Sequence, residues 1–308
     1  MKPPLKIGTR ESELAVWQAT QVQTLLKENG VSSELVYIKS EGDVDTVTPL
    51  YELGVQGIFT KTLDAALLNK TIDIAVHSMK DVPTQLAKGI KQAAVLKRAS
   101  YKDILVYKGD KSFLEDKNSV ATIATSSIRR IAQWLNRYPD HLIENLRGNV
   151  NTRLRKVGEN TWNGAIFAAA GLERINLRPE NSVDLDWMLP APAQGAIMIV
   201  CREDDPVAFE ACNLFNDADT ALCTKLERDF LRTLLGGCST PISALAEVKD
   251  EKLILRGNIC STDGKEIIEI EKESSLENSQ QLGVNAANEI LKDTRAQKII
   301  YTIRNEKS

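Results

Sequence analysis

The sequence feature that most constrains the fold is an alternation of short apolar runs with amphipathic stretches between residues 5 and 200. Each apolar run has the length of a buried strand, and each amphipathic stretch repeats its apolar residues at helical spacing. This alternation predicts βα units and an open, mostly parallel sheet. The expected strands cover residues 5–8, 34–39, 72–76, 104–107, 120–124, 142–145, 165–168 and 197–200, and the expected helices cover residues 11–28, 57–69, 126–138 and 150–157.

The last third of the chain follows a different pattern. Its strand-like runs succeed one another almost directly, which predicts an antiparallel meander flanked by helices. The Pro-rich segment "LPAPAQGA" (189–196) marks a crossing between domains. We therefore expect an α/β protein with doubly wound sheets and a smaller α/β domain. The expected meander covers residues 242–248, 252–259 and 266–270, and the flanking helices cover residues 220–235 and 278–292.

Length and composition indicate a globular protein of two or three domains. The chain has 308 residues, of which 43% are hydrophobic and 26% charged, so each domain can bury a core of its own. No apolar stretch reaches the length of a bilayer span, and the start "MKPPLKIGTRES" lacks the apolar region of a signal peptide. These patterns predict a cytoplasmic protein.

The cysteines do not suggest a metal site or a disulfide framework. They lie far apart without a CxxC pair, and the chain has only two histidines, so we expect no bound metal. In a reducing compartment they would be free thiols. The five are Cys201, Cys212, Cys223, Cys238 and Cys260.

The basic residues are unevenly distributed. Residues 121–180 contain eight arginines and one lysine, Lys156, whereas the rest of the chain contains eight arginines and twenty-two lysines. Arginine is preferred where a planar fork must bind a carboxylate or phosphate through two bonds. A solvated basic surface would not need to exclude lysine, so this window predicts anion binding. The net charge of −3 argues against a polyanion such as nucleic acid as the partner.

Three junctions between a strand and a helix carry hydroxyl residues together with arginine. They read "GTRESELA" (8–15), "ATSSIRR" (124–130) and "LRGNVNTRLR" (146–155). Helix N-termini at the ends of parallel strands are ready sites for anions. N-capping explains the hydroxyl residues equally well, but it gives no reason for an arginine at each junction. Together the three junctions favour a ligand that carries several carboxylates or phosphates.

The segment "HSMKDVP" (77–83) follows the expected strand 72–76 directly. Pro83 keeps the loop extended, and Lys80 and Asp81 lie within it. A surface turn with a self-paired lysine and aspartate is one interpretation. The other interpretation is a catalytic carboxylate, which the position after a buried strand favours. His77 fits a structural role better than a catalytic one.

The segment "LLGGCSTPIS" (234–243) places Cys238 behind two glycines and ahead of Pro241, after the expected helix 220–235. Structural cysteines are usually buried among apolar neighbours, where the thiol is inert. Two glycines cannot cover a thiol. The setting therefore favours chemistry or covalent attachment over packing.

These segments, together with "TPLYELGVQGIFTKTLD", "AAAGLERI", "LPAPAQGA" and "LERDFL", resemble the porphobilinogen deaminase (hydroxymethylbilane synthase) family in order and separation across nearly the whole chain. The resemblance implies two periplasmic-binding-protein-like domains around a cleft and a small α/β domain with a three-stranded antiparallel sheet. Domain 1 would comprise residues 1–98 and 195–215, domain 2 residues 99–194, and domain 3 residues 216–308.

The family resemblance also implies the reaction. Four porphobilinogen molecules would be joined head to tail, with loss of ammonia, on a covalent dipyrromethane primer, and water would release linear hydroxymethylbilane for tetrapyrrole and heme synthesis. Cys238 would bear the cofactor through a thioether, and Asp81 would be the catalytic group. Amine departure needs a proton and leaves a pyrrolic cation that needs a negative charge.

The carboxylates of the growing chain would account for the arginines. We expect porphobilinogen as the small-molecule partner, no nucleic-acid or membrane partner, and a monomer. The expected cofactor-binding residues are Cys238, Lys80, Asp81, Thr125, Ser126, Ser127, Arg129, Arg130, Arg147 and Gly148. The expected substrate-binding residues are Arg10, Ser12, Phe59, Arg147, Arg153, Arg174 and Gln194.

Three positions depart from the family pattern. Gln56 replaces a common lysine, Glu41 a usual arginine, and Ala193 a usual glycine. Two other functions are compatible with parts of the sequence, an anion receptor on the same architecture and a thiol hydrolase. A receptor leaves Cys238 and the Lys80–Asp81 loop unexplained, and neither histidine lies in a motif that a thiol hydrolase would need.

Overall fold

The computed structural model describes residues 3–39, 60–116, 119–234 and 240–305. The described residues form two compact units. Unit 1 comprises residues 3–39, 60–99 and 195–222, and unit 2 comprises residues 100–116, 119–194, 223–234 and 240–305. The chain therefore leaves unit 1 once and returns to it, and α7 (Ala218–Thr233) contains the last boundary. The three-domain boundaries expected from the family remain a prediction.

Unit 1 is built on a five-stranded sheet in the order β2-β1-β3-β10-β4. Strands β1, β2 and β3 are parallel, and β10 runs antiparallel to both β3 and β4, so four of the five strands share one direction. The strands are β1 (Leu5–Thr9), β2 (Ser33–Tyr37), β3 (Ile74–Ser78), β4 (Ile90–Val95) and β10 (Ile197–Arg202). The helices are α1 (Glu13–Glu28), α2 (Lys61–Leu68) and α6 (Pro206–Asn213), with the 3-10 turn η2 (Met79–Asp81) after β3.

The apolar runs that predicted these strands form the core of unit 1. Ile7, Ile74 and Ile199 of three neighbouring strands pack with Val22 and Leu26 of α1, and all five are buried. Burial of such side chains contributes about 1.5–3 kcal/mol each. The core therefore fixes α1 against the sheet and places its first turn beside the end of β1.

Unit 2 contains a second five-stranded sheet in the order β7-β6-β8-β5-β9. Strands β7, β6 and β8 are parallel, and β5 runs antiparallel to both β8 and β9, so four strands again share one direction. The strands are β5 (Asp103–Tyr107), β6 (Thr122–Ala124), β7 (Leu142–Glu144), β8 (Gly164–Ala168) and β9 (Ser182–Asp184). The helical segments are η3 (Ser112–Leu114), α3 (Ile128–Arg137), α4 (Val150–Glu159) and α5 (Ala169–Glu173).

Both faces of the second sheet are covered. On β5, Ile104 and Val106 pack into one apolar cluster with Phe167, whereas Leu105 packs into another with Trp134 of α3. A strand buried on both faces has apolar residues in succession rather than in alternation. This explains the run "ILV" at residues 104–106.

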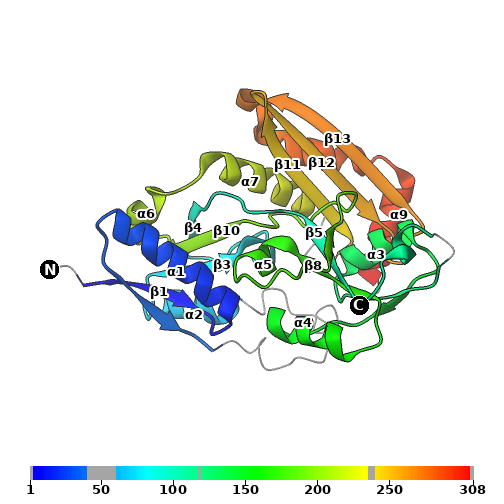
Figure 1. Cartoon of the computed structure of the whole chain (residues 1–308). Helices are drawn as coiled ribbons and strands as arrows, with labels where there is room; N and C mark the ends of the chain where they lie inside the picture. Colours follow the sequence, from blue (N-terminus) through cyan, green and yellow to red (C-terminus); the bar gives the residue numbers. More distant parts are fainter. Residues whose placement is uncertain (1–2, 40–59, 117–118, 235–239, 306–308) are drawn as a thin grey trace. The chain divides into compact units, whose positions relative to one another are not determined.

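The third sheet, also in unit 2, is the antiparallel meander β11-β12-β13. Helices α8 and α9 lie along one side of it in Figure 1 and contact its strands. The strands are β11 (Ile242–Lys249), β12 (Lys252–Cys260) and β13 (Ile267–Ser275), and the helical segments are η4 (Leu276–Gln281), α8 (Leu282–Ile290) and α9 (Thr294–Asn305).

The α/β class, the two mostly parallel sheets and the antiparallel meander expected from the sequence are confirmed. Among the described residues, the strands and α-helices that were not predicted are β4, β9, α5, α6 and α9. The short β9 has no buried residue, so it leaves no apolar run in the sequence. Helix α6 begins at Pro206 directly after its N-cap Asp205, so the sequence does contain a helix-start signal there. No helix among the described residues is long and apolar enough to cross a bilayer.

Candidate functional site

In unit 1, two sequence-predicted segments meet at one edge of the sheet. Arg10 and Ser12 follow β1, and Lys80 and Asp81 follow β3 within η2. Strands β1 and β3 are parallel neighbours, so their carboxyl ends lie side by side. The sheet thus brings Arg10, Ser12 and the Lys80–Asp81 pair to the same edge, where doubly wound sheets bind ligands.

Backbone contacts fix the turn that carries Lys80 and Asp81. The N–H of Met79 donates to the carbonyl of Ala196 (3.0 Å), and the N–H of Val82 donates to the carbonyl of Met79 (3.2 Å). Met79 is buried, whereas Lys80 and Asp81 are each half-buried. The turn therefore leaves the carboxylate within reach of a ligand while its backbone is held.

His77 lies on β3 just before this turn and is 7% exposed. Burial, together with the positive charge of Arg10, lowers the pKa of His77 to about 4. The imidazole is therefore neutral near pH 7. The structural role expected for His77 stays a prediction.

In unit 2, three strand ends meet in the same way. Strands β6, β7 and β8 are parallel neighbours. Thr125, Ser126 and Ser127 follow β6, Arg147 and Gly148 follow β7, and Arg174 ends α5 after β8. The predicted residues therefore share one edge of the second sheet, and Arg153 lies on α4 just beyond it.

Capping accounts for only part of the hydroxyl pattern. Ser12 and Ser127 occupy N-cap positions, but neither makes a side-chain capping bond, whereas Asn149 caps α4 by accepting from the N–H of Thr152. Ser126 instead joins two loops: its Oγ lies 2.7 Å from the carbonyl oxygen of Leu146 and accepts from the Leu146 N–H at 2.9 Å. It also lies 2.5 Å from Oδ1 of Asn145.

The loop before α4 requires glycine at position 148. Its φ of +113° is unfavourable for other residues, and a Cβ there would lie 2.7 Å from Cγ2 of Thr152. The carbonyl of Gly148 accepts from Nε of Arg153 (2.7 Å), and that of Arg147 accepts from Nζ of Lys156 (3.1 Å). Two basic side chains of α4 thus hold the loop that carries Arg147.

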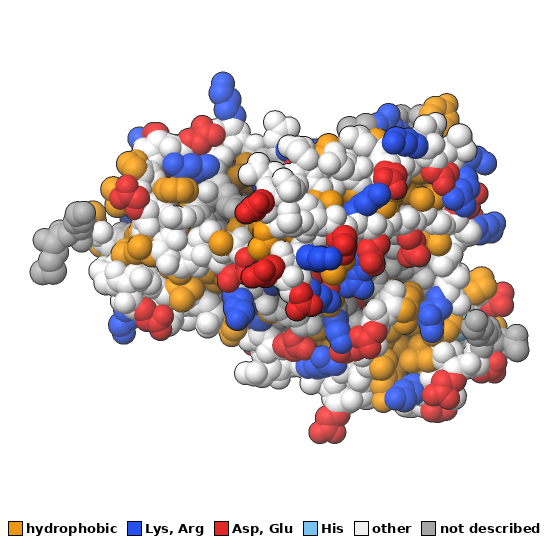
Figure 2. Space-filling view, turned by 90° about the horizontal axis from the view of Figure 1, so that it is seen from above, with side chains coloured by type: hydrophobic (Ala, Val, Ile, Leu, Met, Phe, Trp, Pro, Cys, Tyr) orange, Lys and Arg blue, Asp and Glu red, His pale blue; other side chains and the backbone are white. Residues whose placement is uncertain are grey.

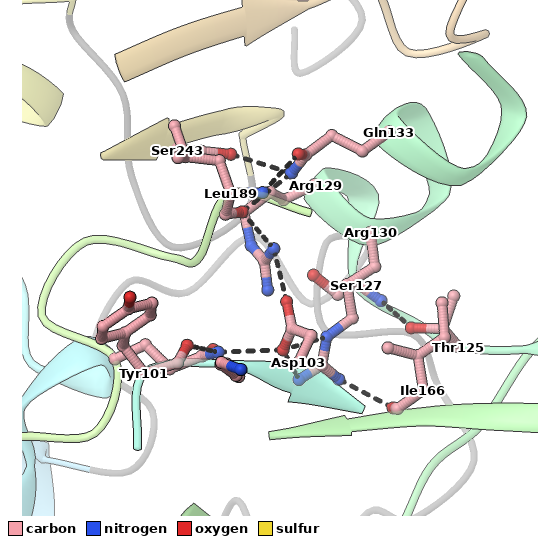
Figure 3. Close-up of polar contacts among 12 residues, drawn as sticks. Tyr101, Asp103, Thr125, Ser127, Arg129, Arg130, Gln133, Ile166, Leu189 and Ser243 are labelled. Carbon is pink, nitrogen blue, oxygen red and sulfur yellow. Dashed lines mark hydrogen bonds and ion pairs between the residues drawn. The ribbon is translucent and has the colours of Figure 1, made fainter. Parts of the chain in front are cut away.

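Arg129 and Arg130, on the first turn of α3, converge on Asp103 of β5 (Figure 3). Nη1 of Arg129 forms an ion pair with Oδ2 of Asp103 at 2.7 Å, and Nη2 of Arg130 forms one with Oδ1 at 2.7 Å. Burial alone would raise the pKa of Asp103, but the charges of Arg129 and Arg130 outweigh it and hold that pKa well below its usual range. The carboxylate is therefore ionised although fully buried.

Gln194 and Gln133 complete this network. Nε2 of Gln194 donates to Oδ1 of Asp103 (2.9 Å) and to the carbonyl of Tyr101 (2.7 Å). Nε2 of Gln133 donates to the carbonyl of Leu189 (3.0 Å), and its Oε1 accepts from the Leu189 N–H (2.8 Å). The two amide side chains thus join the segment 189–194 to β5 and α3.

Arg174 differs from the buried arginines Arg129 and Arg130. It is half-buried, and burial lowers its pKa to about 10 despite the opposing charge of Glu173. It remains protonated at neutral pH and can bind an anion.

The predicted residues Cys238 and Phe59 lie outside the described residues, as do Gln56 and Glu41. The other four cysteines are described and buried. Burial raises the pKa values of Cys212 and Cys260 to about 12, which disfavours the reactive thiolate.

Sequence reasoning missed Asp103, Asn145 and Gln133. Asp103 is the first residue of β5 and stands directly before the apolar run 104–106, and its burial beside two arginines leaves no local pattern in the sequence. Asn145 directly follows β7, where loop residues are common. Gln133 lies within a helix, and only the fold shows that it contacts Leu189.

The sequence matches the family model of the porphobilinogen deaminase dipyrromethane cofactor-binding domain over residues 5–210 and that of the porphobilinogen deaminase C-terminal domain over residues 221–292. It is 39% identical over 295 residues to the porphobilinogen deaminase of Desulforamulus reducens, covering 94% of this chain and 95% of that one. It is 40% identical over 312 residues to that of Chlorobium phaeobacteroides, covering 99% of each chain.

Among solved structures, the fold is similar to a nutrient-binding protein from Burkholderia cenocepacia bound to methionine. That protein is 17% identical, with a TM-score of 0.43, and the similarity covers 70% of this chain and 93% of that one. The two family models and the full-length relatives confirm the resemblance seen in the motifs, and the chain belongs to the porphobilinogen deaminase family.

Proposed function

We propose that Asp81 is the catalytic acid and that the arginines at the two sheet edges bind the carboxylates of substrate and cofactor. The enzyme of this family is a transferase that joins four porphobilinogen molecules, with loss of ammonia, into hydroxymethylbilane for tetrapyrrole synthesis. The observation that carries the proposal for Asp81 is its place in a fixed turn at the end of β3, half-exposed and beside Lys80.

Asp81 would act in two stages of each cycle. As the carbon–nitrogen bond of porphobilinogen breaks, a carboxylic acid can give its proton to the departing amine, which leaves as ammonia. The carboxylate that remains can balance the positive charge left on the pyrrole. The free α-carbon of the last pyrrole in the growing chain then attacks this cation and forms the new carbon–carbon bond. The attacking carbon loses its proton, and that proton can restore the acid. One side chain therefore serves both stages.

The dipyrromethane cofactor fits the donor set of unit 2. When bound, this cofactor supplies the free pyrrole carbon to which the first substrate is joined. It is built from substrate units that each carry an acetate and a propionate, so it is rich in carboxylates. Arg129, Arg147 and Arg174 at the strand ends, with the amino-terminal ends of α3 and α4 beside them, supply cationic and N–H donors for such groups.

Lys80, Arg10 and Ser12 would serve the same purpose at the edge of unit 1. The family pattern also assigns Phe59 to substrate binding. The unit 2 site would also be shaped by the other residues expected from the sequence, namely Thr125, Ser126, Ser127, Arg130, Gly148, Arg153 and Gln194. The contacts of Ser126, Arg130 and Gln194 favour a supporting role, because their polar atoms already bond to neighbouring protein groups.

We further propose that Cys238 bears the cofactor through a thioether. The burial of the other four cysteines supports this assignment by elimination. We also propose the domain boundaries given above, a cytoplasmic monomer, and no nucleic-acid or membrane partner. Figure 2 shows acidic and basic side chains interspersed over one face, which supports the absence of a polyanion partner.

The attachment is tested by replacing each cysteine with serine and weighing the intact protein. Cys238→Ser should lose the mass of one dipyrromethane and the colour that an aldehyde reagent gives with pyrroles. Cys201→Ser, Cys212→Ser, Cys223→Ser and Cys260→Ser should each retain both. Cofactor that survives on Cys238→Ser would show that another residue holds it.

A further inference from the structure

Asp103 is a fully buried carboxylate on which Arg129 and Arg130 converge (Figure 3), and Gln194 also donates to it. We propose that Asp103 is a positioning residue for the carboxylate-binding site, which fixes Arg129 so that its Nε–Nη2 edge is available to a ligand carboxylate. The inference rests on the proposed role of Arg129 as a ligand-binding residue, and it assigns different tasks to Arg129 and Arg130.

The protein contacts of Arg130 occupy the Nε–Nη2 edge of its guanidinium group, which could otherwise bind a ligand. Its Nε and Nη2 both donate to Oδ1 of Asp103, at 3.1 and 2.7 Å. Its Nη1 donates to the carbonyl of Ile166 on β8 at 2.9 Å. A carboxylate normally binds arginine through this Nε–Nη2 edge. Arg130 therefore acts as the anchor that holds Asp103 in place and keeps it ionised.

The contacts of Arg129 leave the same edge unused. Nη1 of Arg129 forms an ion pair with Oδ2 of Asp103 at 2.7 Å and donates a hydrogen bond to the carbonyl of Leu189 at 2.8 Å. Within the described part of the chain, Nε and Nη2 of Arg129 donate to no protein acceptor. A guanidinium has five N–H donors in a rigid fork, so fixing one nitrogen from two sides sets the direction of the others.

The acceptors that hold Arg129 are themselves fixed. Oδ1 of Asp103 receives Gln194 as well as Arg130, and Leu189 is bonded at both its N–H and its carbonyl by Gln133. Two guanidinium groups share one carboxylate, so the cluster keeps a net positive charge. An arginine held only for stability would be expected to use its carboxylate-binding edge within the protein, as Arg130 does.

The test compares Asp103→Asn with the wild type in cofactor content, KM and kcat. Asparagine keeps the size of the side chain but removes the charge, so Arg129 loses its fixed direction. We expect a smaller fraction of folded protein to carry dipyrromethane by intact mass. In the loaded fraction, KM for porphobilinogen should rise about 10- to 100-fold, the range expected for a charge-assisted contact, while kcat changes less.

Asp205→Asn is the matched control. Asp205 pairs with the buried Arg202 in unit 1 and caps α6, so its loss should lower the melting temperature as Asp103→Asn does. A general loss of stability should leave cofactor content and KM of the folded protein unchanged. If Asp103→Asn is folded, fully loaded and has the wild-type KM, the positioning role is wrong.

If Asp103→Asn does not fold, the double variant Asp103→Leu/Arg130→Met replaces it. Exchanging a buried ion pair for apolar residues of similar volume is often tolerated, and Arg129 is retained. The double variant should show the same rise in KM or loss of cofactor. A wild-type KM in this variant would overturn the proposal.

Arg129→Leu separates this inference from the proposed function. If Arg129→Leu raises KM and Asp103→Asn does not, Arg129 binds the ligand but Asp103 does not position it. If Arg129→Leu has the wild-type KM and cofactor content, the ligand role of Arg129 and the inference about Asp103 both fail.

Discussion

The two five-stranded sheets share an arrangement of four strands in one direction and one reversed, yet their functional edges are built differently. The edge in unit 1 presents the half-exposed pair Lys80 and Asp81 on a short fixed turn. The edge in unit 2 carries the arginine pair Arg129 and Arg130, which is buried and bonded to Asp103.

This difference matches the two tasks of the reaction. A group that gives and takes protons must reach the reacting atoms, so its side chain cannot be bonded into the protein on all sides. A group that binds carboxylates gains from a fixed direction, because less side-chain freedom is lost when the ligand binds. One fold thus supports proton transfer at one sheet edge and anion binding at the other.

The largest effect should come from removing the acid at the edge of unit 1. Asp81→Asn keeps the size but loses the charge and the proton, so hydroxymethylbilane formation at saturating porphobilinogen should fall by roughly 10²- to 10⁴-fold. Asp81→Glu keeps the group in a displaced position and should retain more activity than Asn. Equal losses in the two variants would indicate that position 81 tolerates no change of shape, rather than needing an acid.

The two edges should also respond differently to pH. Unfolded histidine takes up a proton near pH 6.5, whereas His77 in the folded protein does so only near pH 4. The free energy of unfolding should therefore drop as pH falls from 7 to 4, by up to about 3 kcal/mol from this residue. Asp103 has a lowered pKa, so its contribution is present above the unfolded value of 3.8 and is lost only in stronger acid.

Urea unfolding at pH 7 and pH 4.5 measures how much of the pH dependence of the free energy of unfolding comes from His77. His77→Gln cannot take up a proton, so its stability should depend less on pH than that of the wild type over this interval. Identical pH dependence in the two proteins would mean that the pKa of His77 is not lowered in the folded state.

At the edge of unit 2, loss of an arginine should weaken binding more than chemistry. Arg147→Leu should raise KM for porphobilinogen by about 10- to 100-fold, since a charge-assisted contact contributes about 1.5–3 kcal/mol. Arg155→Leu is the matched control, because Arg155 lies on the neighbouring helix α4 and pairs with Glu159 at the surface. A similar rise of KM in both variants would point to general electrostatics instead of a specific contact.

The smallest effect concerns Ala193, which stands where the family usually has glycine. This residue is buried and has a φ of +62°, a conformation that costs residues other than glycine about 1–2 kcal/mol. Ala193→Gly should therefore stabilise the protein by about 0.5–1 kcal/mol after the greater freedom of unfolded glycine is subtracted. Ala196→Gly, at a position without positive φ, should destabilise it, and chemical denaturation measures both changes.

The sequence predicted most of the buried strands and the longer helices that pack on them, because burial leaves apolar residues at regular spacing, but it missed the buried strand β4 and the short helices α5 and α6. It also predicted the segments that the sheets bring to their edges, since parallel strands place their carboxyl ends together. The bonds within those edges were not predictable. Nothing in the sequence near residue 103 shows that α3 will place two arginines beside it, and nothing near residue 193 shows that its backbone will adopt a positive φ.

The most direct test of this division of tasks is a single-turnover measurement of ammonia release from porphobilinogen, with enzyme shown by mass to carry its full cofactor. At saturating substrate, Asp81→Asn should release ammonia far more slowly than the wild type, whereas Arg147→Leu should release it at close to the wild-type rate. If fully loaded Asp81→Asn matches the wild type in this step, Asp81 is an ordinary loop residue and the edge of unit 1 does not supply the chemistry.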